Sequence, residues 1–318
     1  MMSGKNMSLL SFNIDVKSSI DINCDTSKVR DFVGDSNNWK EFSPWIILDE
    51  QAKNKISGNG RDVGSILSWQ GKYIGEGEIE VTEKNDNAIF YKLRFLKPFK
   101  SKAKTWFSFE SSGSNTKVTW HMKSSMPIFL IFFKQTFISM ISSDYDRGLI
   151  MLKSFLEKGS VDSKMEDLGI GETKKQSFIG IKINSCKLSD LPEKMSEIFD
   201  KLKELVNQEN ISNPRFYTIY HHMDIKTMSF GFTTAVSFEN CDKVNIVGDM
   251  YKGICPEVKT LKVRHTGDWE FLGNAWKYGM VRCFGKHTKY KYNKRSPSFE
   301  VYESMDSPKI TDVYISVK

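Results

Sequence analysis

The sequence predicts a two-domain protein of the α+β class, and three observations lead to this prediction. The chain has 318 residues, which is long for one domain and ordinary for two. Hydrophobic residues make up 39% and charged residues 27% of it, so each half can bury a core. Both halves combine strand-like alternation with amphipathic helices, and a polar, glycine-containing stretch separates them. We therefore expect domains at residues 1–159 and 173–318, joined by a linker at 160–172.

The first half begins with a strand over residues 13–22, where apolar and polar residues alternate. Asp25 offers an N-cap for a short helix, and a second short helical turn stops before Pro44. From Phe133 to Leu156 the apolar residues recur every three or four positions, so we expect one long helix that ends near Gly159. Between these helices, turn residues separate strand-like runs that predict an antiparallel meander: residues 64–69, 73–82, 88–95, 103–109 and 117–122.

Short local motifs occur in a definite order along this half: Asn38-Trp39, Ser43-Pro44-Trp45, Val63-Gly64-Ser65, Thr116 to Trp120, and Arg147-Gly148-Leu149 with Leu152 to Glu157. Their order resembles the helix-grip fold of the START-related SRPBCC superfamily, in its polyketide-cyclase-like form. The resemblance implies a long helix across a curved antiparallel sheet, with a mostly apolar cavity between them. A plain core position is the alternative for each aromatic residue that could line this cavity: Trp69, Tyr73, Phe90, Phe95, Trp106 and Trp120.

The second half shows a repeated order of elements. A strand at residues 177–183 is followed by a helix that starts at Asp190 and carries Pro192 in its first turn. A strand, a helix and two strands, occurring twice, predict a pseudo-duplicated α+β unit with a cup between its halves. The remaining elements of this pattern are strands at residues 215–222, 228–238 and 258–265, a helix from Asp268, and two closing strands.

The first closing strand holds the candidate ligand site. Ser298, Glu300 and Tyr302 share one strand face, so a carboxylate lies beside a phenol. A charged residue in mid-strand lies either on the solvent side of a sheet or in a pocket, and the spacing alone leaves both interpretations open.

Three stretches of this half resemble the GyrI-like effector-binding domain: Phe299 to Val317 with its Ser307-Pro308 turn, Pro214 to His221, and His265 to Trp269. The resemblance implies that Glu300 is the acid at the floor of a ligand cup. An aromatic cage around one carboxylate suits a cationic or planar amphipathic ligand. The candidate walls, for which core packing is the alternative, are Tyr217, Tyr220, Trp269, Trp276 and Tyr302.

Other function classes find less support in the sequence. No Ser-His-Asp set, metal-ligand cluster or phosphate-binding loop is evident, so we expect neither a cofactor nor a metal. The net charge of +7 and the acid-free segment 271–299 favour nucleic acid only weakly without a DNA-binding module, and we do not expect it as a partner. Five scattered cysteines, no export signal and no run of about 20 apolar residues predict a cytoplasmic protein with reduced thiols.

We therefore expect a small-molecule binding protein with two ligand-binding modules, which senses or sequesters small apolar or cationic ligands. An enzyme is the first alternative, because Glu300 with a nearby tyrosine could act as the general base of a hydrolase or cyclase. The second alternative is a transcription-regulatory effector subunit that acts with a DNA-binding protein partner.

Overall fold

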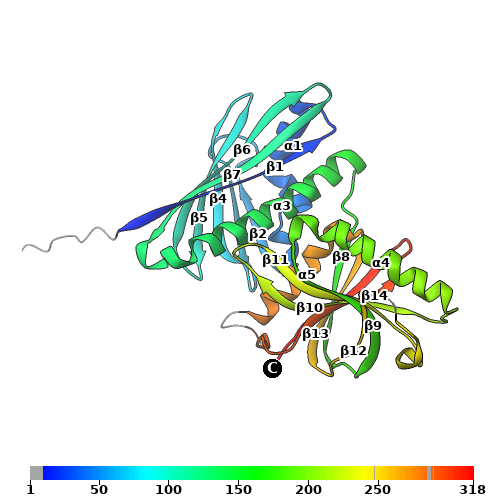
Figure 1. Cartoon of the computed structure of the whole chain (residues 1–318). Helices are drawn as coiled ribbons and strands as arrows, with labels where there is room; N and C mark the ends of the chain where they lie inside the picture. Colours follow the sequence, from blue (N-terminus) through cyan, green and yellow to red (C-terminus); the bar gives the residue numbers. More distant parts are fainter. Residues whose placement is uncertain (1–9, 247, 285–287, 289) are drawn as a thin grey trace, which may run out of the picture. The chain divides into compact units, whose positions relative to one another are not determined.

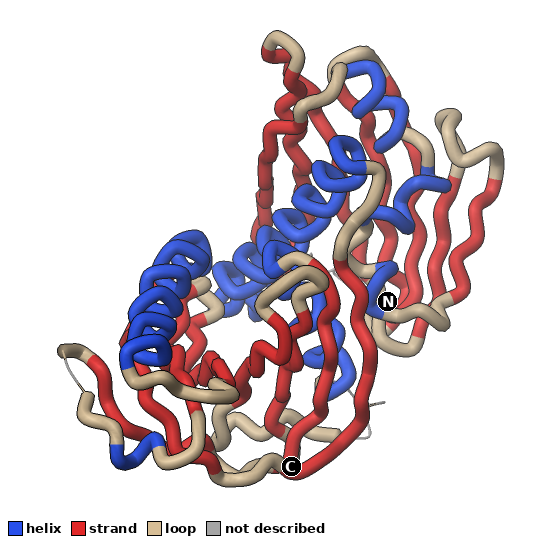
Figure 2. The backbone as a smooth tube through the Cα atoms, turned by 90° about the vertical axis from the view of Figure 1, so that its right-hand side faces the viewer, coloured by secondary structure: helices blue, strands red, loops and turns tan. Residues whose placement is uncertain are grey.

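The computed structural model describes residues 10–246, 248–284, 288 and 290–318. The chain divides into two compact units, Met1–Val161 and Asp162–Lys318. Each unit contains one antiparallel sheet with helices on it, as Figures 1 and 2 show by colour and by secondary structure. The α+β class with a helix-grip sheet in the first half and a pseudo-duplicated second half is confirmed.

The first unit has a seven-stranded sheet in the order β1-β7-β6-β5-β4-β3-β2. Its elements are β1 (Ser11–Ile22), α1 (Thr26–Val33), η1 (Ser36–Asn38), α2 (Trp39–Phe42), η2 (Ile46–Leu48), β2 (Lys53–Ser57), β3 (Ile66–Gly71), β4 (Gly75–Lys84), β5 (Ala88–Lys97), β6 (Ser101–Ser112), β7 (Asn115–Pro127), η3 (Ile128–Phe133) and α3 (Lys134–Lys158). The edge strand β2 was not expected, because Ile56 is its one apolar residue and alternation is therefore weak.

The long helix α3 closes one face of this sheet, as the resemblance implied (Figure 1). It buries Tyr145, Leu149 and Leu152, which recur at helical spacing. The helix ends where Gly159 adopts a φ of +81°, a left-handed conformation that glycine tolerates without a steric penalty, and the Gly159 N–H donates to the carbonyl of Phe155.

The second unit has an eight-stranded sheet in the order β12-β9-β11-β10-β14-β15-β13-β8. Its elements are β8 (Ser163–Glu172), β9 (Gln176–Lys187), η4 (Leu188–Asp190), α4 (Leu191–Gln208), β10 (Arg215–Asp224), β11 (Ser229–Ser237), η5 (Cys241–Lys243), β12 (Met250–Cys255), β13 (Lys259–Gly267), η6 (Trp269–Phe271), α5 (Leu272–Cys283), β14 (Ser298–Ser304) and β15 (Ile310–Ser316).

The segment expected as a linker, residues 160–172, is mostly a strand. Residues 163–172 form β8, which pairs with β13 from Ser163↔Gly267 to Glu172↔Lys259. This strand lies at the sheet edge and has one neighbour, and most of its side chains are exposed or half-buried, so its polar sequence resembles a linker. The change from one unit to the other falls between Val161 and Asp162 instead.

The sheet order explains why the centre of the second unit can hold a site. The series β8-β9-α4-β10-β11 repeats as β12-β13-α5-β14-β15, and the two opening strands are exchanged, since β8 pairs with β13 and β12 pairs with β9. The two repeats meet at β10 and β14, which are antiparallel neighbours. Side chains from both repeats therefore converge on one face of this central strand pair, between α4, which packs on β9 and β11, and α5, which packs on β13, β15 and β8.

Candidate functional site

The candidate site centres on the side chain of Glu300, in the middle of β14. Glu300 is in register with Thr218 of β10 on one side and with Val313 of β15 on the other. Only 2% of the residue is exposed. The solvent-face interpretation of this carboxylate is therefore wrong, and the buried interpretation holds.

Three aromatic side chains donate hydrogen bonds to the Glu300 carboxylate, each from a different element. The hydroxyl of Tyr302, on β14 itself, donates to Oε2 at 2.5 Å. The indole Nε1 of Trp276, on α5, donates to Oε1 at 2.5 Å, and the hydroxyl of Tyr220, on β10, donates to the same oxygen at 3.1 Å. Sequence reasoning named all three as walls of a cup, and the structure brings them onto the acid.

The Tyr302 hydroxyl is itself held in place from behind. It lies 3.0 Å from Thr218 Oγ1, which lies 3.2 Å from Thr234 Oγ1 on β11. A phenol has one hydrogen and a carboxylate can only accept, so Tyr302 donates to Glu300 and accepts from Thr218. Two threonines that no sequence pattern singled out thus fix the orientation of the phenol.

Burial and hydrogen bonding act on the Glu300 pKa in opposite directions. Burial raises the pKa of Glu300, because the charged form loses its hydration, and the three donors only partly offset this effect. The pKa values of Tyr220 and Tyr302 are also raised, by burial and by the neighbouring Glu300. Both phenols therefore stay protonated and remain donors.

A second buried carboxylate in the same sheet shows what Glu300 lacks. Asp312, on β15, is 0% exposed and faces the other side of the sheet. It forms ion pairs with Lys262 at 2.6 Å and with Arg264 at 2.7 Å. Although burial raises the pKa of Asp312, its hydrogen bonds to Arg264 and Lys262 prevail and the pKa is lowered. Within the described part of the chain Glu300 has no ion pair, so its negative charge has no counterpart there.

Trp269 belongs to the surroundings of this cluster and does not contact the acid through its indole nitrogen. Its Nε1 donates to Thr311 Oγ1 at 3.1 Å, and its ring meets the Tyr302 ring edge-on at 5.6 Å. Phe199 of α4 packs on both rings, at 5.0 Å from the Tyr302 ring and 6.2 Å from the Trp269 ring. Phe199 was not predicted as a site residue; its signal in the sequence was the apolar stripe of α4.

Tyr217 is not part of the cup, contrary to the prediction. It lies three positions before Tyr220 on β10, and an odd spacing puts the two side chains on opposite faces of the strand. Its hydroxyl donates to Gln176 Oε1 at 2.7 Å, and it packs with Phe299 and Val301 on the face away from Glu300.

In the first unit, Trp120 is a core residue. Its ring stacks on Tyr145 of α3 at 4.1 Å and on Phe107 at 4.6 Å. Its Nε1 donates to Thr105 Oγ1 at 3.0 Å, so its polar atom is satisfied within the fold. Trp39 and Phe42 pack edge-on against it, and these rings fill the space between α3 and this part of the sheet.

Two other predicted cavity residues lie on the outer face of the sheet. Phe90 and Trp106 are register partners whose rings stack at 6.1 Å, and Trp106 stacks on His121 at 4.5 Å. Their strand neighbours Tyr91 and Phe107 are buried on the inner face, and alternation places Phe90 and Trp106 opposite to them. The prediction that they line the inner cavity is therefore wrong.

The remaining candidates lie at the end of the inner face where β5 ends. The ring of Trp69 meets the ring of Phe95 edge-on at 6.3 Å. Gly77 of β4 lies between them, in register with Trp69 of β3 on one side and with Phe95 of β5 on the other. A Cβ at Gly77 would fall 2.2 Å from the Trp69 ring, so glycine makes room for the indole. Tyr73 lies in the β3–β4 turn, where its backbone N–H donates to Asp49 Oδ2 at 2.7 Å. Trp69, Tyr73 and Phe95 remain predicted lining residues.

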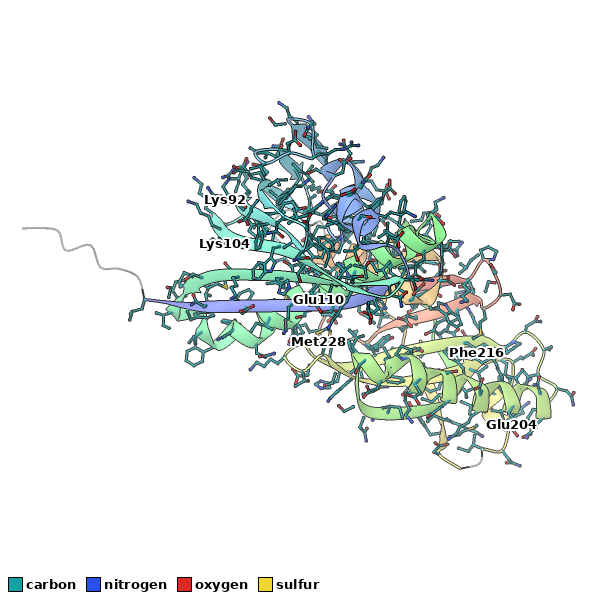
Figure 3. All side chains as sticks on the ribbon, turned by 90° about the horizontal axis from the view of Figure 1, so that it is seen from above. Lys92, Lys104, Glu110, Glu204, Phe216 and Met228 are labelled. Atoms are coloured by element: carbon teal, nitrogen blue, oxygen red, sulfur yellow. The ribbon has the colours of Figure 1, made fainter. Side chains whose placement is uncertain are left out.

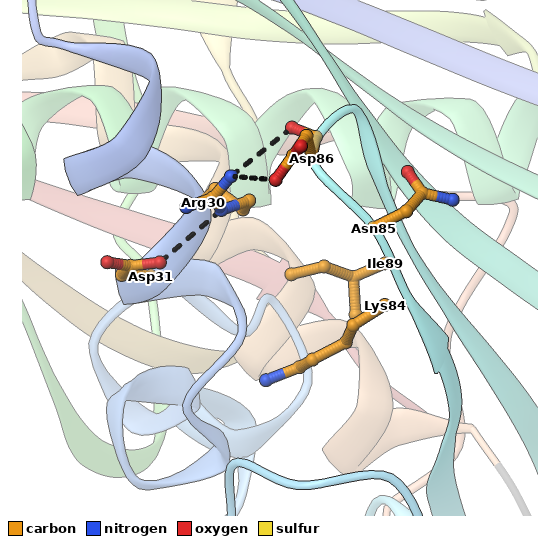
Figure 4. Close-up of a pocket in the computed structure, with 6 residues that line it drawn as sticks. All are labelled: Arg30, Asp31, Lys84, Asn85, Asp86 and Ile89. Carbon is orange, nitrogen blue, oxygen red and sulfur yellow. Dashed lines mark hydrogen bonds and ion pairs between the residues drawn. The ribbon is translucent and has the colours of Figure 1, made fainter.

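A recess of about 230 Å³ lies on the surface of the first unit (Figure 4), and no predicted residue lines it. Arg30 forms ion pairs there with Asp31 at 3.4 Å and with Asp86 at 3.2 Å. Apart from the buried Ile89, its walls are charged or polar, so we assign it no binding role. The full set of lining residues is Arg30, Asp31, Lys84, Asn85, Asp86 and Ile89.

Comparison with known families agrees with this geometry. Residues 13–157 match the family described as polyketide cyclase / dehydrase and lipid transport, and residues 174–318 match the GyrI-like small molecule binding domain. The chain joins a domain of each family. Both resemblances in the sequence are thereby confirmed, and the Glu300 cluster lies inside the GyrI-like small-molecule binding domain. None of the curated proteins matches the chain significantly.

Solved structures resemble about half of the chain. Aha1 from Colwellia psychrerythraea, whose solution structure is a dimer, is 18% identical, covers 46% of this chain and 99% of its own, and has a TM-score of 0.36. XoxI from Bacillus cereus is 16% identical, covers 46% of this chain and 96% of its own, and has a TM-score of 0.37. CalU16 from Micromonospora echinospora is 9% identical, covers 48% of this chain and 86% of its own, and has a TM-score of 0.33.

No helix among the described residues is long and apolar enough to cross a membrane. No group of three or more His, Cys, Asp or Glu side chains in the described ranges could hold a metal ion. Residues 285–287 and 289 of the basic segment 271–299 lie outside the described residues.

Proposed function

We propose that the second unit binds a small cationic or planar amphipathic molecule, with Glu300 as its anionic anchor, and that the protein senses or sequesters such molecules. The contrast between two buried carboxylates carries this proposal. Asp312 has Lys262 and Arg264 as its cations, whereas Glu300 is surrounded by neutral aromatic donors. A ligand cation supplies the missing positive charge, and the ring faces around it add further attraction.

The hydrogen bonds indicate how the carboxylate becomes available to a ligand. Tyr302 is fixed by Thr218 and contacts Oε2, while Oε1 accepts from Tyr220 and Trp276. Trp276 comes from α5 and not from the sheet, so its side chain can turn away while the strands keep their pairing. In this proposal the ligand cation takes the place of the Trp276 N–H at Oε1, and Trp276 becomes a wall beside it.

Sensing or sequestration differs from catalysis in what happens to the ligand. The alternative of a hydrolase or cyclase also uses Glu300, because a raised pKa suits a general base. Incubation of the protein with each bound compound, followed by mass spectrometry of the recovered compound, distinguishes the two. Recovery of unchanged compound supports binding, and a new product supports the enzyme.

We also propose a cytoplasmic location, which suits the five free cysteines.

The experiment that tests the proposal is a thermal-shift screen with lipids, aromatic polyketides and cationic dyes, because a compound that binds only the native state raises the melting temperature. Glu300→Gln keeps the shape of the side chain and removes its charge. We expect this substitution to weaken the binding of a cationic dye by about 1–3 kcal/mol, as when a charged group loses its partner.

The matched control is Glu303→Gln, the same chemical change on the same strand. Glu303 is exposed and pairs with Arg215 at 2.6 Å. We expect the control to bind dyes as the parent does. Equal dye affinity in the parent and in Glu300→Gln would overturn the proposal.

A further inference from the structure

One end of the first unit gathers three segments that are distant in sequence. The Ile128 N–H donates to the Leu10 carbonyl at 2.8 Å, and Ser11 is in register with Pro127, so the start of β1 and the start of η3 are side by side. Strand β6 begins at this same end, because it runs antiparallel to β7, and Ala103 is paired with Ser124. The hairpin of residues 96–100 therefore lies at the same end of the sheet as η3. We call Leu10, residues 96–99 and residues 128–133 the apolar rim.

The apolar rim exposes large hydrophobic side chains to an unusual extent. The sequence of η3 is Ile-Phe-Leu-Ile-Phe-Phe, and none of its six residues is buried. Phe132 is 83% exposed, Phe129 is 67% exposed and Phe99, on the hairpin, is 81% exposed. Single exposed apolar residues are common on proteins, but a group of them gathered at one end of a domain indicates an interaction surface.

The charges around the apolar rim are almost all positive. The sequence has no acid from Phe95 to Phe109 or from His121 to Ser143. The nearest carboxylates are already paired, Glu76 with Lys97 at 2.8 Å and Asp15 with Lys123 at 3.4 Å. The lysines that flank the rim are Lys97, Lys100, Lys102, Lys123 and Lys134.

Three lysines also form a row on the adjoining outer face of the sheet, between Asp15 on β1 and Glu80 on β4. Lys104 is in register with Lys92 on one side and with Lys123 on the other. Figure 3 shows the side chains of Lys92 and Lys104 next to each other. Neighbouring lysines repel each other in water, and an anionic surface relieves this repulsion.

We propose that the apolar rim docks the first unit on an anionic lipid bilayer surface. Phe99, Phe129 and Phe132 enter the boundary between headgroups and acyl chains, and the flanking lysines lie among the lipid phosphates. An anionic bilayer carries negative charge over its whole surface, which complements a rim whose unpaired charges are all lysines. All six side chains of η3 are apolar, so this helix has no polar face to turn toward water. This surface is separate from Glu300, so the proposal does not depend on the proposed ligand.

The test is flotation of the full chain with vesicles of phosphatidylcholine that contain about one third phosphatidylserine, beside vesicles of phosphatidylcholine alone. We expect flotation with the anionic vesicles, weaker flotation with the neutral vesicles, and loss of most of the difference at about 1 M salt, where the Debye length is about 3 Å. The double variant Phe129→Ser/Phe132→Ser should bind anionic vesicles at least about tenfold more weakly, because two rings no longer leave water.

Two matched pairs of variants separate the charge and the apolar contributions. Lys100→Gln/Lys102→Gln should weaken binding by roughly fivefold per lysine. The control Lys28→Gln/Lys117→Gln removes the same charge from α1 and from the opposite end of β7, and it should change binding far less. Val63→Ser, at a residue 60% exposed in the β2–β3 loop, is the control for the phenylalanines.

Three results would overturn the proposal. The first is no flotation of the parent with anionic vesicles. The second is flotation that Phe129→Ser/Phe132→Ser leaves unchanged. The third is a parent that sediments as a dimer while Phe129→Ser/Phe132→Ser sediments as a monomer, which would make the rim an interface between two copies. Loss of dye binding in Glu300→Gln has no bearing on any of these results.

Discussion

Two buried carboxylates on neighbouring strands of the second unit have opposite electrostatic surroundings. Asp312 lies between Lys262 and Arg264, and its pKa is lowered. Glu300 lies among aromatic donors, and its pKa is raised. Asp312 thus carries its own counterions within the fold, whereas in our proposal the ligand supplies the counterion of Glu300.

The largest expected effect is the loss of stability when Asp312, the carboxylate with two ion pairs, is neutralised. Asp312→Asn leaves Lys262 and Arg264 next to each other without a negative charge between them. We expect a loss of about 2–3 kcal/mol in the free energy of unfolding, below the usual value for a fully buried pair because both cations are partly exposed. Urea denaturation of the parent and the variant measures this loss. A change below about 0.5 kcal/mol would mean that the pairs contribute little, and the contrast with Glu300 would lose its basis.

The two carboxylates should give stability a pH dependence of opposite sign. The pKa of Glu300 is raised above 4.5 in the folded chain, so its contribution is largest below pH 4.5 and is lost as the pH rises through the folded pKa. The pKa of Asp312 is lowered below 3.8, so its contribution is present above pH 3.8 and is lost as the pH falls through the folded pKa.

Denaturation at a series of pH values checks these signs. The stability of the parent relative to Glu300→Gln should fall with rising pH, and the stability of the parent relative to Asp312→Asn should rise. Slopes of the same sign for the two variants would contradict the account.

A smaller effect separates the two tyrosines of β10. Tyr220→Phe removes one hydrogen bond to Glu300, so it should raise the pKa of that carboxyl further and lower the stability by about 1 kcal/mol. Tyr217→Phe removes a hydrogen bond to Gln176 on the other face. We expect dye binding to change in the first variant only, as measured by isothermal titration calorimetry. The same loss of dye affinity in both would show that the effect is not confined to the Glu300 face.

The sequence predicted the elements whose pattern is set by burial on one face. The long helix α3 and the central strands of both sheets follow clear periodicities, and the structure contains them. The edge strands β2, β8 and β12 were not predicted. Each has one neighbouring strand and at most one buried side chain, so none of the three shows a regular alternation of apolar and polar residues.

Only part of the candidate site could be predicted, because the sequence reveals contacts within one strand but not contacts between elements. Glu300 and Tyr302 lie in one strand, two residues apart, so their shared face could be inferred from the period of a strand. Trp276 and Tyr220 contact the acid through the packing of α5 and the pairing of β10, which no local pattern reveals. The errors at Tyr217, Phe90 and Trp106 arose because aromatic residues were grouped by type and not by strand face.

The most direct test of the central claim is the affinity of a quaternary ammonium dye as a function of pH, for the parent and for Glu300→Gln. The charge of such a dye does not titrate, so any pH dependence comes from the protein. The account predicts that the affinity of the parent rises as the pH increases through the raised pKa of Glu300, and that Glu300→Gln binds more weakly with a flat profile. Identical profiles for the two proteins would contradict the role of Glu300 as the anionic anchor.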